Sequence, residues 1–321
     1  MRKIAITGAA GFIGSNLAQR LAETCEVVAI DNLSYGLREQ VPDRVRFVRA
    51  DIRDRNLADA LAGAEAVFHL AAKNCIPDCE DDPVETVSVN VEGTVNVLEA
   101  CRRAGIRRII FAETSALYEG VDTLPAREDI VAPKSLYAIS KFATIPFTQR
   151  YAQRFDMKLT ALRYFNVYGP RQDYRRTIPP LMSAFIIKLL KGERPIIYGT
   201  GLKRRDFVFV DDVNDFHELC LSDSQTIGKT FNVGSGANHS VLEIYNAISA
   251  MLGIDITPEH RADMPGDEAQ ATLADITPAK ALGWKPRVSL DEGLRRSADF
   301  IREHVLAAGA SAHGDAENSK I

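Results

Sequence analysis

The chain has 321 residues, of which 46% are hydrophobic and 26% charged, and its formal net charge is −4. This composition is typical of a globular protein with room for one large or two modest domains, and the small acidic excess gives no reason to expect nucleic acid or an anionic membrane as a partner. No run of 18 apolar residues is present and MRKIAITG leads directly into a strand-like pattern, so we expect neither a signal peptide nor a membrane span.

Short β-rich runs alternate with helical patterns through the first half of the chain. The runs expected to be strands contain few charges, as is typical of strands buried on both faces of a parallel sheet. They are KIAITG, EVVAID, VRFVRAD, AVFHLAA, RIIFAE and LTALRYFN. The helical patterns between them include SNLAQRLAE, TVSVNVEGTVNVLEACRRAG and SLYAISKFATIPFTQRYAQRF. This alternation predicts an α/β fold with a doubly wound parallel sheet.

The pattern changes after about residue 166, where NVYGPRQDYRRTIPP is too irregular for another strand–helix unit. DFVFVDDVNDFHELCL resembles a strand and a helix that return to the sheet, whereas VLEIYNAISAMLG and DEGLRRSADFIREH are amphipathic helices of a smaller C-terminal region. We therefore predict two partly interleaved domains and a flexible tail. The first domain covers 1–165 and regains about 207–233, the second covers 166–206 and 234–306, and the tail covers 307–321.

The segment ITGAAGFIGSNLA places Gly8, Gly11 and Gly14 between the first strand and the first helix. Glycines there permit a tight turn and let backbone N–H groups and the helix N-terminus approach a pyrophosphate. The spacing is GxxGxxG rather than GxGxxG, and a glycine turn without a ligand is the alternative. Asp31 ends the second strand, where a carboxylate binds ribose hydroxyls and repels a 2′-phosphate. These features predict a dinucleotide site that favours NAD over NADP.

The five cysteines are an odd number in a sizeable chain. Only Cys75 and Cys79 are close in sequence, and no second pair completes a zinc site. We therefore expect no metal, and we expect reduced structural thiols in a cytoplasmic protein.

The motif YAISK puts Tyr137 and Lys141 on the same face of a helix. A lysine charge about 4 Å from a phenol, at an effective dielectric of about 20, is worth on the order of 4 kcal/mol, which lowers a tyrosine pKa from about 10 to roughly 7. The positive charge of bound nicotinamide acts in the same direction. We therefore predict that Tyr137 is a general base toward a sugar hydroxyl. The alternative is a Tyr and a Lys on a solvated helix face.

Ten motifs along nearly the whole chain carry a family resemblance. They are TGAAGFIG at 7–14, Asp31, AD at 50–51, HLAA at 69–72, NVEGT at 90–94, TSALY at 114–118, YAISK at 137–141, RYFNVYGPRQ at 163–172, RRDFVFVDDV at 204–213 and PGD at 265–267. From residue 1 to about 305 the sequence resembles the extended short-chain dehydrogenase/reductase family, specifically its nucleotide-sugar epimerases and dehydratases. The resemblance implies a Rossmann-type fold, NAD as cofactor and a nucleotide-sugar substrate.

The resemblance also implies roles for individual residues. Tyr137 is expected to be the base, Lys141 to lower its pKa and bind the nicotinamide ribose, and Thr114 to bridge the substrate O4 and the base. The expected cofactor contacts are Gly8, Gly11, Phe12, Ile13 and Gly14 at the turn, Asp31 and Asn32 after the second strand, Asp51 and Ile52 beside the adenine, and Leu70, Ala71, Ala72, Lys73 and Asn90 along the cofactor's path.

The expected substrate contacts are Ser115, Asn166 and Arg205 near the sugar and diphosphate, Tyr198 against the base, and Thr272 near the sugar C2 group. A strand-end turn and a surface charge are the alternatives for Asn166 and Arg205. Arg171, Arg175 and Arg176 are equally well explained as solvated loop charges.

The segment TSALY bears on the reaction type. In the family that this chain resembles, members that remove water carry TDE at this place and decarboxylating members carry TSE. This chain has Thr114, Ser115 and Ala116 there. Without those acids, the implied chemistry is hydride removal from C4, a 4-keto intermediate and hydride return, which is the work of a 4-epimerase. Two alternatives stay open: a dehydratase or decarboxylase in which Glu113 or Glu119 replaces the missing acid, and a non-catalytic NAD-binding sensor.

Three further features depart from or extend the resemblance. Met264 stands where many epimerases carry a phosphate-binding arginine, and Ala271 or Thr272 falls where some hold a bulky tyrosine, so we expect room for a 2-acetamido sugar. An apolar stripe runs along the helix at about 84–104 and the helix after Tyr137. The resemblance implies that these two helices form a four-helix bundle with a second subunit, so we predict a homodimer, and burial against the chain's own sheet is the alternative. The residues concerned are Val87, Val91, Val95, Leu98, Ile145, Phe147 and Tyr151.

Overall fold

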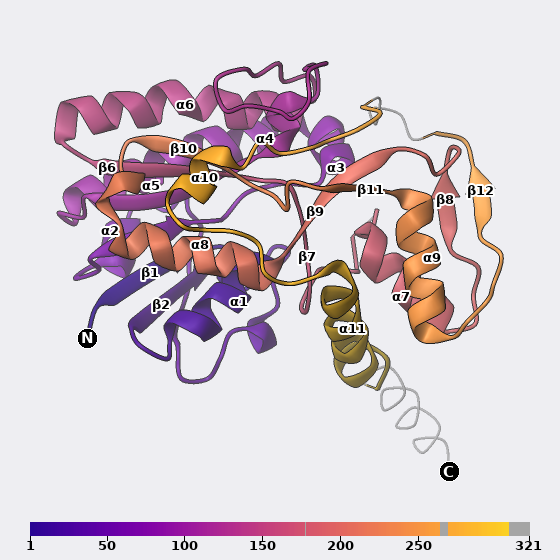
Figure 1. Cartoon of the computed structure of the whole chain (residues 1–321). Coiled ribbons are helices and arrows are strands. Elements are labelled where there is room, and N and C mark those ends of the chain that lie inside the picture. The colour runs from indigo at the N-terminus through magenta and orange to yellow at the C-terminus, as the bar shows by residue number, and fades with distance from the viewer. Residues whose placement is uncertain (177, 264–268, 308–321) are drawn as a thin grey trace, which may run out of the picture.

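A seven-stranded parallel sheet forms the centre of the computed structural model, which describes residues 1–176, 178–263 and 269–307 (Figure 1). The strand order is β10-β6-β5-β4-β1-β2-β3. The strands are β1 (Lys3–Thr7), β2 (Glu26–Asp31), β3 (Arg46–Arg49), β4 (Ala66–His69), β5 (Arg108–Thr114), β6 (Lys158–Tyr164) and β10 (Lys229–Val233). This arrangement confirms the predicted Rossmann-type, doubly wound sheet.

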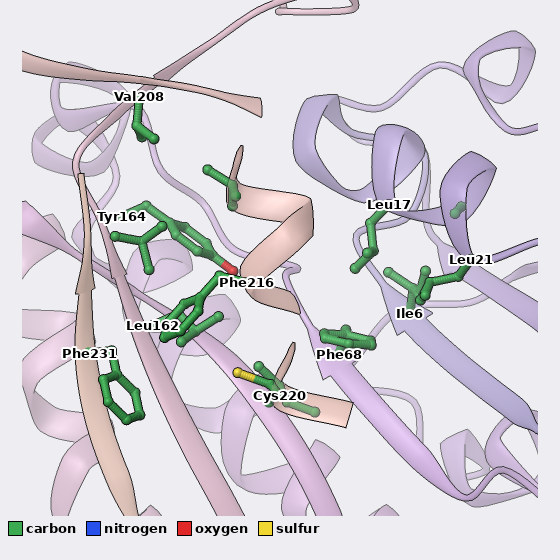
Figure 2. Packing of buried hydrophobic residues seen from close by; sticks show 14 of the residues in the cluster. Ile6, Leu17, Leu21, Phe68, Leu162, Tyr164, Val208, Phe216, Cys220 and Phe231 are labelled. Atoms are coloured by element: carbon green, nitrogen blue, oxygen red, sulfur yellow. The ribbon is translucent and has the colours of Figure 1, made fainter. Parts of the chain in front are cut away.

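Side chains alternate between the two faces of the sheet and contact different helices, as the period of a strand requires. Ile4 and Ile6 of β1 pack on the side of α1 (Phe12–Leu21) and α8 (Val210–Ser222), together with Leu17, Phe68 and Phe216 (Figure 2). Ala5, between the two isoleucines, packs on the opposite side in a second cluster with residues of α2 (Leu57–Leu61), α5 (Gly93–Arg103) and α6 (Leu136–Phe155). Both faces of the sheet are therefore covered by helices (Figure 1).

Shorter helices connect these elements. They are η1 (Arg38–Gln40), α3 (Ile76–Asp81), α4 (Pro83–Val87), η2 (Ser88–Glu92), which continues into α5, η3 (Ser115–Tyr118) and η4 (Ser224–Thr226).

A smaller layer of structure follows β6 and contains two small sheets. The three-stranded sheet has the order β11 (Asn238–Ser240), β9 (Arg204–Phe209), β7 (Asn166–Tyr168), and a two-stranded sheet pairs β12 (Glu259–Arg261) with β8 (Ile196–Tyr198). Its helices are α7 (Leu181–Leu190), α9 (Val241–Leu252), α11 (Leu290–Phe300) and η5 (Ile301–Leu306), whereas α10 (Thr277–Ala281) packs against β10 of the large sheet. Phe185, Ile244 and Leu294 form part of its own hydrophobic core. We call this part the substrate layer and the large sheet with its helices the nucleotide layer.

Local sequence signals set the ends of the long helices. Ser240 and Glu243 form a capping box at the start of α9, and Gly253 ends that helix with a left-handed φ of 67°. Ser135 caps α6 by accepting a hydrogen bond from the Ala138 N–H. Among the described residues, we find no helix with the length and apolar character needed to cross a bilayer.

Candidate functional site

A cavity of about 420 Å³ lies where β1, β2 and β4 end. Carboxyl ends of parallel strands meet at one edge of a sheet, and ligands of doubly wound folds bind there. Fifteen of the predicted cofactor residues line this cavity: Gly8, Gly11, Phe12, Ile13, Gly14, Asp31, Asn32, Asp51, Ile52, Leu70, Ala71, Ala72, Lys73, Tyr137 and Lys141.

The glycine turn is shaped by close backbone contacts. Gly8 has a φ of 72°, and a Cβ there would lie 2.7 Å from the Ala71 nitrogen. A Cβ at Gly14 would lie 2.2 Å from the Gly8 carbonyl oxygen. The N-terminus of α1 follows at once, with Gly11 as an N-cap that offers no side chain to its free N–H groups. The N–H groups of the turn itself are already bonded within the protein, so the donors left for the cavity are those at the start of α1, which fit the pyrophosphate of a dinucleotide.

Two carboxylates, those of Asp31 and Asp51, line the same cavity. Asp31 accepts hydrogen bonds from the N–H groups of Ala10 (2.9 Å) and Leu33 (2.8 Å), although burial raises its pKa. Asp51 accepts from Asn32 (2.9 Å) and Arg53 (2.8 Å), and the hydrogen bond from Arg53 holds the pKa of Asp51 well below its usual range. Asp31 has acceptor capacity left for ribose hydroxyls, as NAD binding requires.

Asn90 is the one predicted cofactor residue that does not line the cavity in the described structure. It is buried, its Oδ1 accepts from the Lys73 N–H (2.8 Å), and its Nδ2 donates to the Lys73 carbonyl and to the Ser140 hydroxyl, both at 2.9 Å. Asn90 therefore ties the loop after β4 to helix α6 and acts on the cavity through Lys73.

A second cavity, of about 1040 Å³, adjoins the first and extends toward the substrate layer. The predicted residues Thr114, Ser115, Asn166, Arg205 and Thr272 line it. Tyr198 lines neither cavity in the described part of the chain and lies on β8 beside Arg261. The two cavities share eight lining residues, namely Phe12, Ile13, Asn74, Glu113, Tyr137, Tyr164, Asp173 and Arg176. Tyr137 thus stands where the cavities join.

Burial shifts the pKa values of Tyr137 and Lys141, the two residues of the YAISK pair, in opposite directions. Burial raises the pKa of Tyr137 to about 12, although a hydrogen bond with Thr114 acts in the opposite direction. Burial also lowers the pKa of Lys141 to about 8, although the charge of Glu113 raises it. The predicted fall of the tyrosine pKa toward neutrality is therefore wrong for the protein's own groups. The sequence argument counted the attraction of the ammonium and left out the cost of desolvating a phenolate.

Thr114 is fixed at the end of β5. Its Oγ1 accepts a hydrogen bond from the Ala116 N–H (3.1 Å), which starts the turn of η3. A hydroxyl that accepts one bond still has its hydrogen to donate, and here the partner is Tyr137. This bond connects the loop after β5 to the first turn of α6.

Glu113 is occupied by a buried ion pair. Its Oε2 lies 2.6 Å from Arg163 Nε, and the two side chains are only 2% and 5% exposed. The same guanidinium donates to the Tyr118 hydroxyl (3.0 Å) and to the Glu128 carbonyl (2.7 Å).

Glu119 is occupied at the start of α6. Its carboxylate accepts from the N–H groups of Lys134 (3.0 Å) and Ser135 (2.7 Å) and from the Ser135 hydroxyl (2.8 Å). Glu119 therefore anchors the backbone just before α6, at and beside the N-cap residue Ser135.

The loop between β7 and α7 contributes cavity residues that sequence reasoning did not assign. Arg175 donates to the Tyr35 carbonyl (2.9 Å) and Arg176 to the Asn74 side chain (2.8 Å), and all four residues line the first cavity. Arg171 instead turns to the Ser15 carbonyl (2.9 Å). The arginine-rich sequence signals charge in this loop, but the sequence alone does not separate inward-facing arginines from solvated ones. Met264 and Asp267 lie outside the described residues.

Comparison with known proteins gives a consistent result. Residues 4–234 match the sequence model of the NAD dependent epimerase/dehydratase family. The UDP-glucose 4-epimerase of Mycolicibacterium smegmatis is 37% identical over 307 residues, which cover 92% of this chain and 97% of that protein.

Two solved structures have the same fold over nearly their whole length. The UDP-glucose 4-epimerase of Thermotoga maritima with UDP-glucose superposes with a TM-score of 0.90 at 34% identity, covering 94% of this chain and 99% of the other. The UDP-N-acetylglucosamine 4-epimerase of Methanobrevibacter ruminantium, in complex with UDP-N-acetylmuramic acid, also gives 0.90, at 30% identity, covering 95% and 99%.

Proposed function

Because the chain belongs to the NAD-dependent epimerase/dehydratase family, as its motifs predicted, we propose that it is an NAD-dependent nucleotide-sugar 4-epimerase. Its substrate is a UDP-hexose or a UDP-N-acetylhexosamine, the classes on which the similar proteins act. The enzyme is an isomerase, since the hydride that leaves C4 returns to the same carbon.

The residues at the junction of the two cavities supply the proton chemistry. NAD in the first cavity would supply the acceptor and donor of the C4 hydride. Tyr137 takes the O4 proton and gives it back at the same oxygen, and the Thr114 hydroxyl holds the phenol in place. Lys141, with a pKa of about 8, is mostly cationic at neutral pH and stabilises the phenolate. The large second cavity leaves room for the 4-keto sugar to turn its other face.

The single observation that carries the choice of reaction is the state of the two nearby acids. Glu113 is held in the ion pair with Arg163, and Glu119 is held at the start of α6. Removing the carboxylate from Glu113 would leave a buried guanidinium unpaired. Neither acid is free to handle a C5 proton or a departing hydroxyl, so dehydration and decarboxylation are disfavoured. The retained Thr114, Tyr137 and Lys141 disfavour a non-catalytic sensor.

The substrate layer holds the rest of the nucleotide sugar. In this proposal Asn166 and Arg205, both at the second cavity, bind the diphosphate, and Ser115 faces the sugar. Thr272 also lines this cavity, and its Oγ1 accepts from the Asp206 N–H (3.2 Å). A small residue held there leaves space at C2, which favours acceptance of 2-acetamido sugars. Contact of Tyr198 with the base stays a prediction.

The two layers divide the work. Residues 1–165 and about 207–233 form the NAD-binding domain in this proposal, and 166–206 and 234–306 form the substrate-binding domain. We place the protein in the cytoplasm, an assignment supported by its five free cysteines.

A homodimer is the proposed assembly. Five apolar side chains on α4 and α6 are exposed, with Val84 at 81% and Val87 at 54%, and the others are Ile139, Phe142 and Phe147. An apolar surface of this kind is typical of an interface. Leu98, which the sequence placed on the same stripe, is buried inside the chain.

One incubation tests the reaction. NAD-loaded protein mixed with a panel of UDP- and dTDP-sugars is expected to give a product of unchanged mass with inverted C4, read by mass spectrometry and proton NMR. Loss of water or of carbon dioxide would establish the dehydratase or decarboxylase alternative, and the absence of turnover for every sugar would establish the sensor. Tyr137→Phe is expected to abolish turnover, whereas Tyr151→Phe on the same helix is a matched control that leaves it intact.

A further inference from the structure

Arg176 occupies a singular place in the site. Within the described residues it is the only cationic side chain that lines both cavities. It extends from the loop after β7, in the substrate layer, and its Nη2 donates to Asn74 Oδ1 at 2.8 Å. Asn74 follows β4 in the nucleotide layer, so this hydrogen bond connects the two layers. It lies where the two cavities join, since Asn74, Tyr137 and Arg176 line both of them.

The positive charge of Arg176 is only loosely paired. Asp173 lies between two arginines, but its carboxylate is 3.1 Å from Arg175 Nε and 4.0 Å from Arg176 Nε. Arg175 is thus the closer ion-pair partner, and the Arg176 guanidinium is anchored by a neutral amide. A charge held by a neutral partner keeps most of its effect on other groups nearby.

Several charged or titratable groups face Tyr137. They are Lys141 on the same helix, Glu113 and Asp173 at the junction of the cavities, Glu119 at the start of α6, Cys79 on α3, and Arg176. Glu113 is neutralised by Arg163, and Glu119 is bound to backbone N–H groups. The charge of Arg176 lowers the pKa of the Tyr137 phenol, whereas Cys79 and Glu119 raise it. Arg176 therefore counteracts part of the effect of burial.

We propose that Arg176 is a positioning residue that stabilises the Tyr137 phenolate from the substrate layer, while Lys141 does so from within α6. The idea rests on the proposed role of Tyr137 as the base. It adds that the acidity of the phenol depends on the loop between β7 and α7 being docked on Asn74. Tyr137 then becomes an effective base only when the two layers are in contact through Arg176 and Asn74.

Spectroscopic titration of the NAD-loaded protein, in which the positive charge of the cofactor also lowers the pKa of Tyr137, tests this without any substrate. The tyrosinate absorbance of the protein minus that of its Tyr137→Phe variant reports the ionisation of Tyr137 alone. We expect Arg176→Gln to raise the apparent pKa of Tyr137 by about 0.5 to 1 pH unit, the size expected for loss of one partly solvated charge. Arg175→Gln removes the same charge one residue earlier, where the side chain lines only the first cavity and pairs with Asp173. It is expected to change the pKa by less than half as much.

The rate profile gives the second readout. Arg176→Gln is expected to move the acid limb of the kcat profile to higher pH by the same amount and to recover activity at high pH. Arg176→Lys keeps a positive charge and is expected to show a smaller shift. Asn74→Ala, which keeps the charge but removes its anchor, is expected to shift the limb in the same direction by less. Equal titrations in Arg176→Gln and Arg175→Gln, or a rise in KM with an unmoved acid limb, would overturn the proposal. If turnover survives Tyr137→Phe, the proposed base is wrong, which is a separate failure.

Discussion

Glu113 and Arg163 form an ion pair that is almost completely buried between neighbouring strands, with 2.6 Å between Oε2 and Nε. The pair lies directly behind the junction of the two cavities, since Glu113 also lines both. A carboxylate at the end of β5 is thus neutralised by its strand neighbour, which removes an acid from the chemistry of the site.

The first prediction concerns the stability of this pair. Glu113→Gln leaves the Arg163 guanidinium buried without its counter-charge, so we expect the free energy of unfolding to fall by about 3–5 kcal/mol. Chemical denaturation followed by circular dichroism measures it. The double variant Glu113→Gln, Arg163→Met should recover part of the loss, because no unpaired charge stays buried. A loss below about 1 kcal/mol in the single variant would show that the pair is not needed for stability.

The second prediction concerns the buried cation on α6. Because burial lowers the pKa of Lys141 from 10.5 to about 8, the folded state binds fewer protons than the unfolded chain between those pH values. The cost of burying the charge is therefore fully present below about pH 8 and is relieved as pH rises toward 10.5. We expect Lys141→Met to abolish turnover. We also expect it to raise the free energy of unfolding by about 2–4 kcal/mol at pH 7, with a smaller increase at pH 10. Urea unfolding at both pH values decides it, and lower stability of the variant at pH 7 would contradict the account.

The third prediction concerns the glycine turn. Gly14→Ala places a methyl group 2.2 Å from the Gly8 carbonyl oxygen, so α1 and the turn must separate. We expect NAD affinity to fall by at least about 100-fold, because the backbone donors lose their alignment. Calorimetric titration with NAD measures this, after assay of the cofactor carried through purification. The control is Gly105→Ala, where nothing lies within 4 Å of the new methyl group. The left-handed φ of 74° there is expected to lower the stability of the protein, but NAD affinity should stay unchanged.

The fourth prediction concerns the Thr114 hydroxyl. Thr114→Val keeps the shape of the side chain but removes its hydrogen bond with Tyr137, so we expect kcat to fall by about 10–100-fold with little change in KM. Steady-state kinetics separates the two constants. Ser115→Ala is the matched loss of a hydroxyl in the next residue, and the expected change in kcat is smaller. A larger effect at Ser115 than at Thr114 would reverse the assigned roles.

The fifth prediction concerns assembly. Phe142→Glu and Phe147→Glu place charges on the exposed apolar face of α6, and we expect each to convert the dimer to a monomer in light scattering at micromolar concentration. Leu202→Glu introduces the same charge at another exposed apolar residue, in the substrate layer, and should leave the mass unchanged. A wild-type protein that is already monomeric would refute the proposed interface.

The fold could be predicted because its signals are periodic and local. The alternation of Ile4 and Ile6 with Ala5 between two cores follows from the geometry of a strand, and the glycine spacing between the first strand and the first helix is a local pattern. The pKa of Tyr137 could not be predicted in this way. Desolvation depends on how many segments cover the phenol, and a one-dimensional pattern contains no such information.

Side chains that act through a partner distant in sequence were also beyond the sequence argument. The hydrogen bonds that Asn90 makes to the loop at Lys73 and to Ser140 on α6 are not visible in the sequence. Arg176 could not be separated from the other arginines of its loop, because its significance comes from Asn74, 102 positions away. In both cases the partner is supplied by the crossover connections of the sheet.

The three hydrogen bonds accepted by Glu119 have a consequence for how this site can evolve. These bonds hold the loop that carries Thr114 against the start of the helix that carries Tyr137. The distance between the Thr114 hydroxyl and the Tyr137 phenol is therefore already set in the free enzyme. Glu119 therefore has a structural role and is not available as a reactant. A lineage that recruited Glu119 for elimination would need a replacement anchor for that helix, whereas new acids at Ser115 and Ala116 would leave the anchor in place.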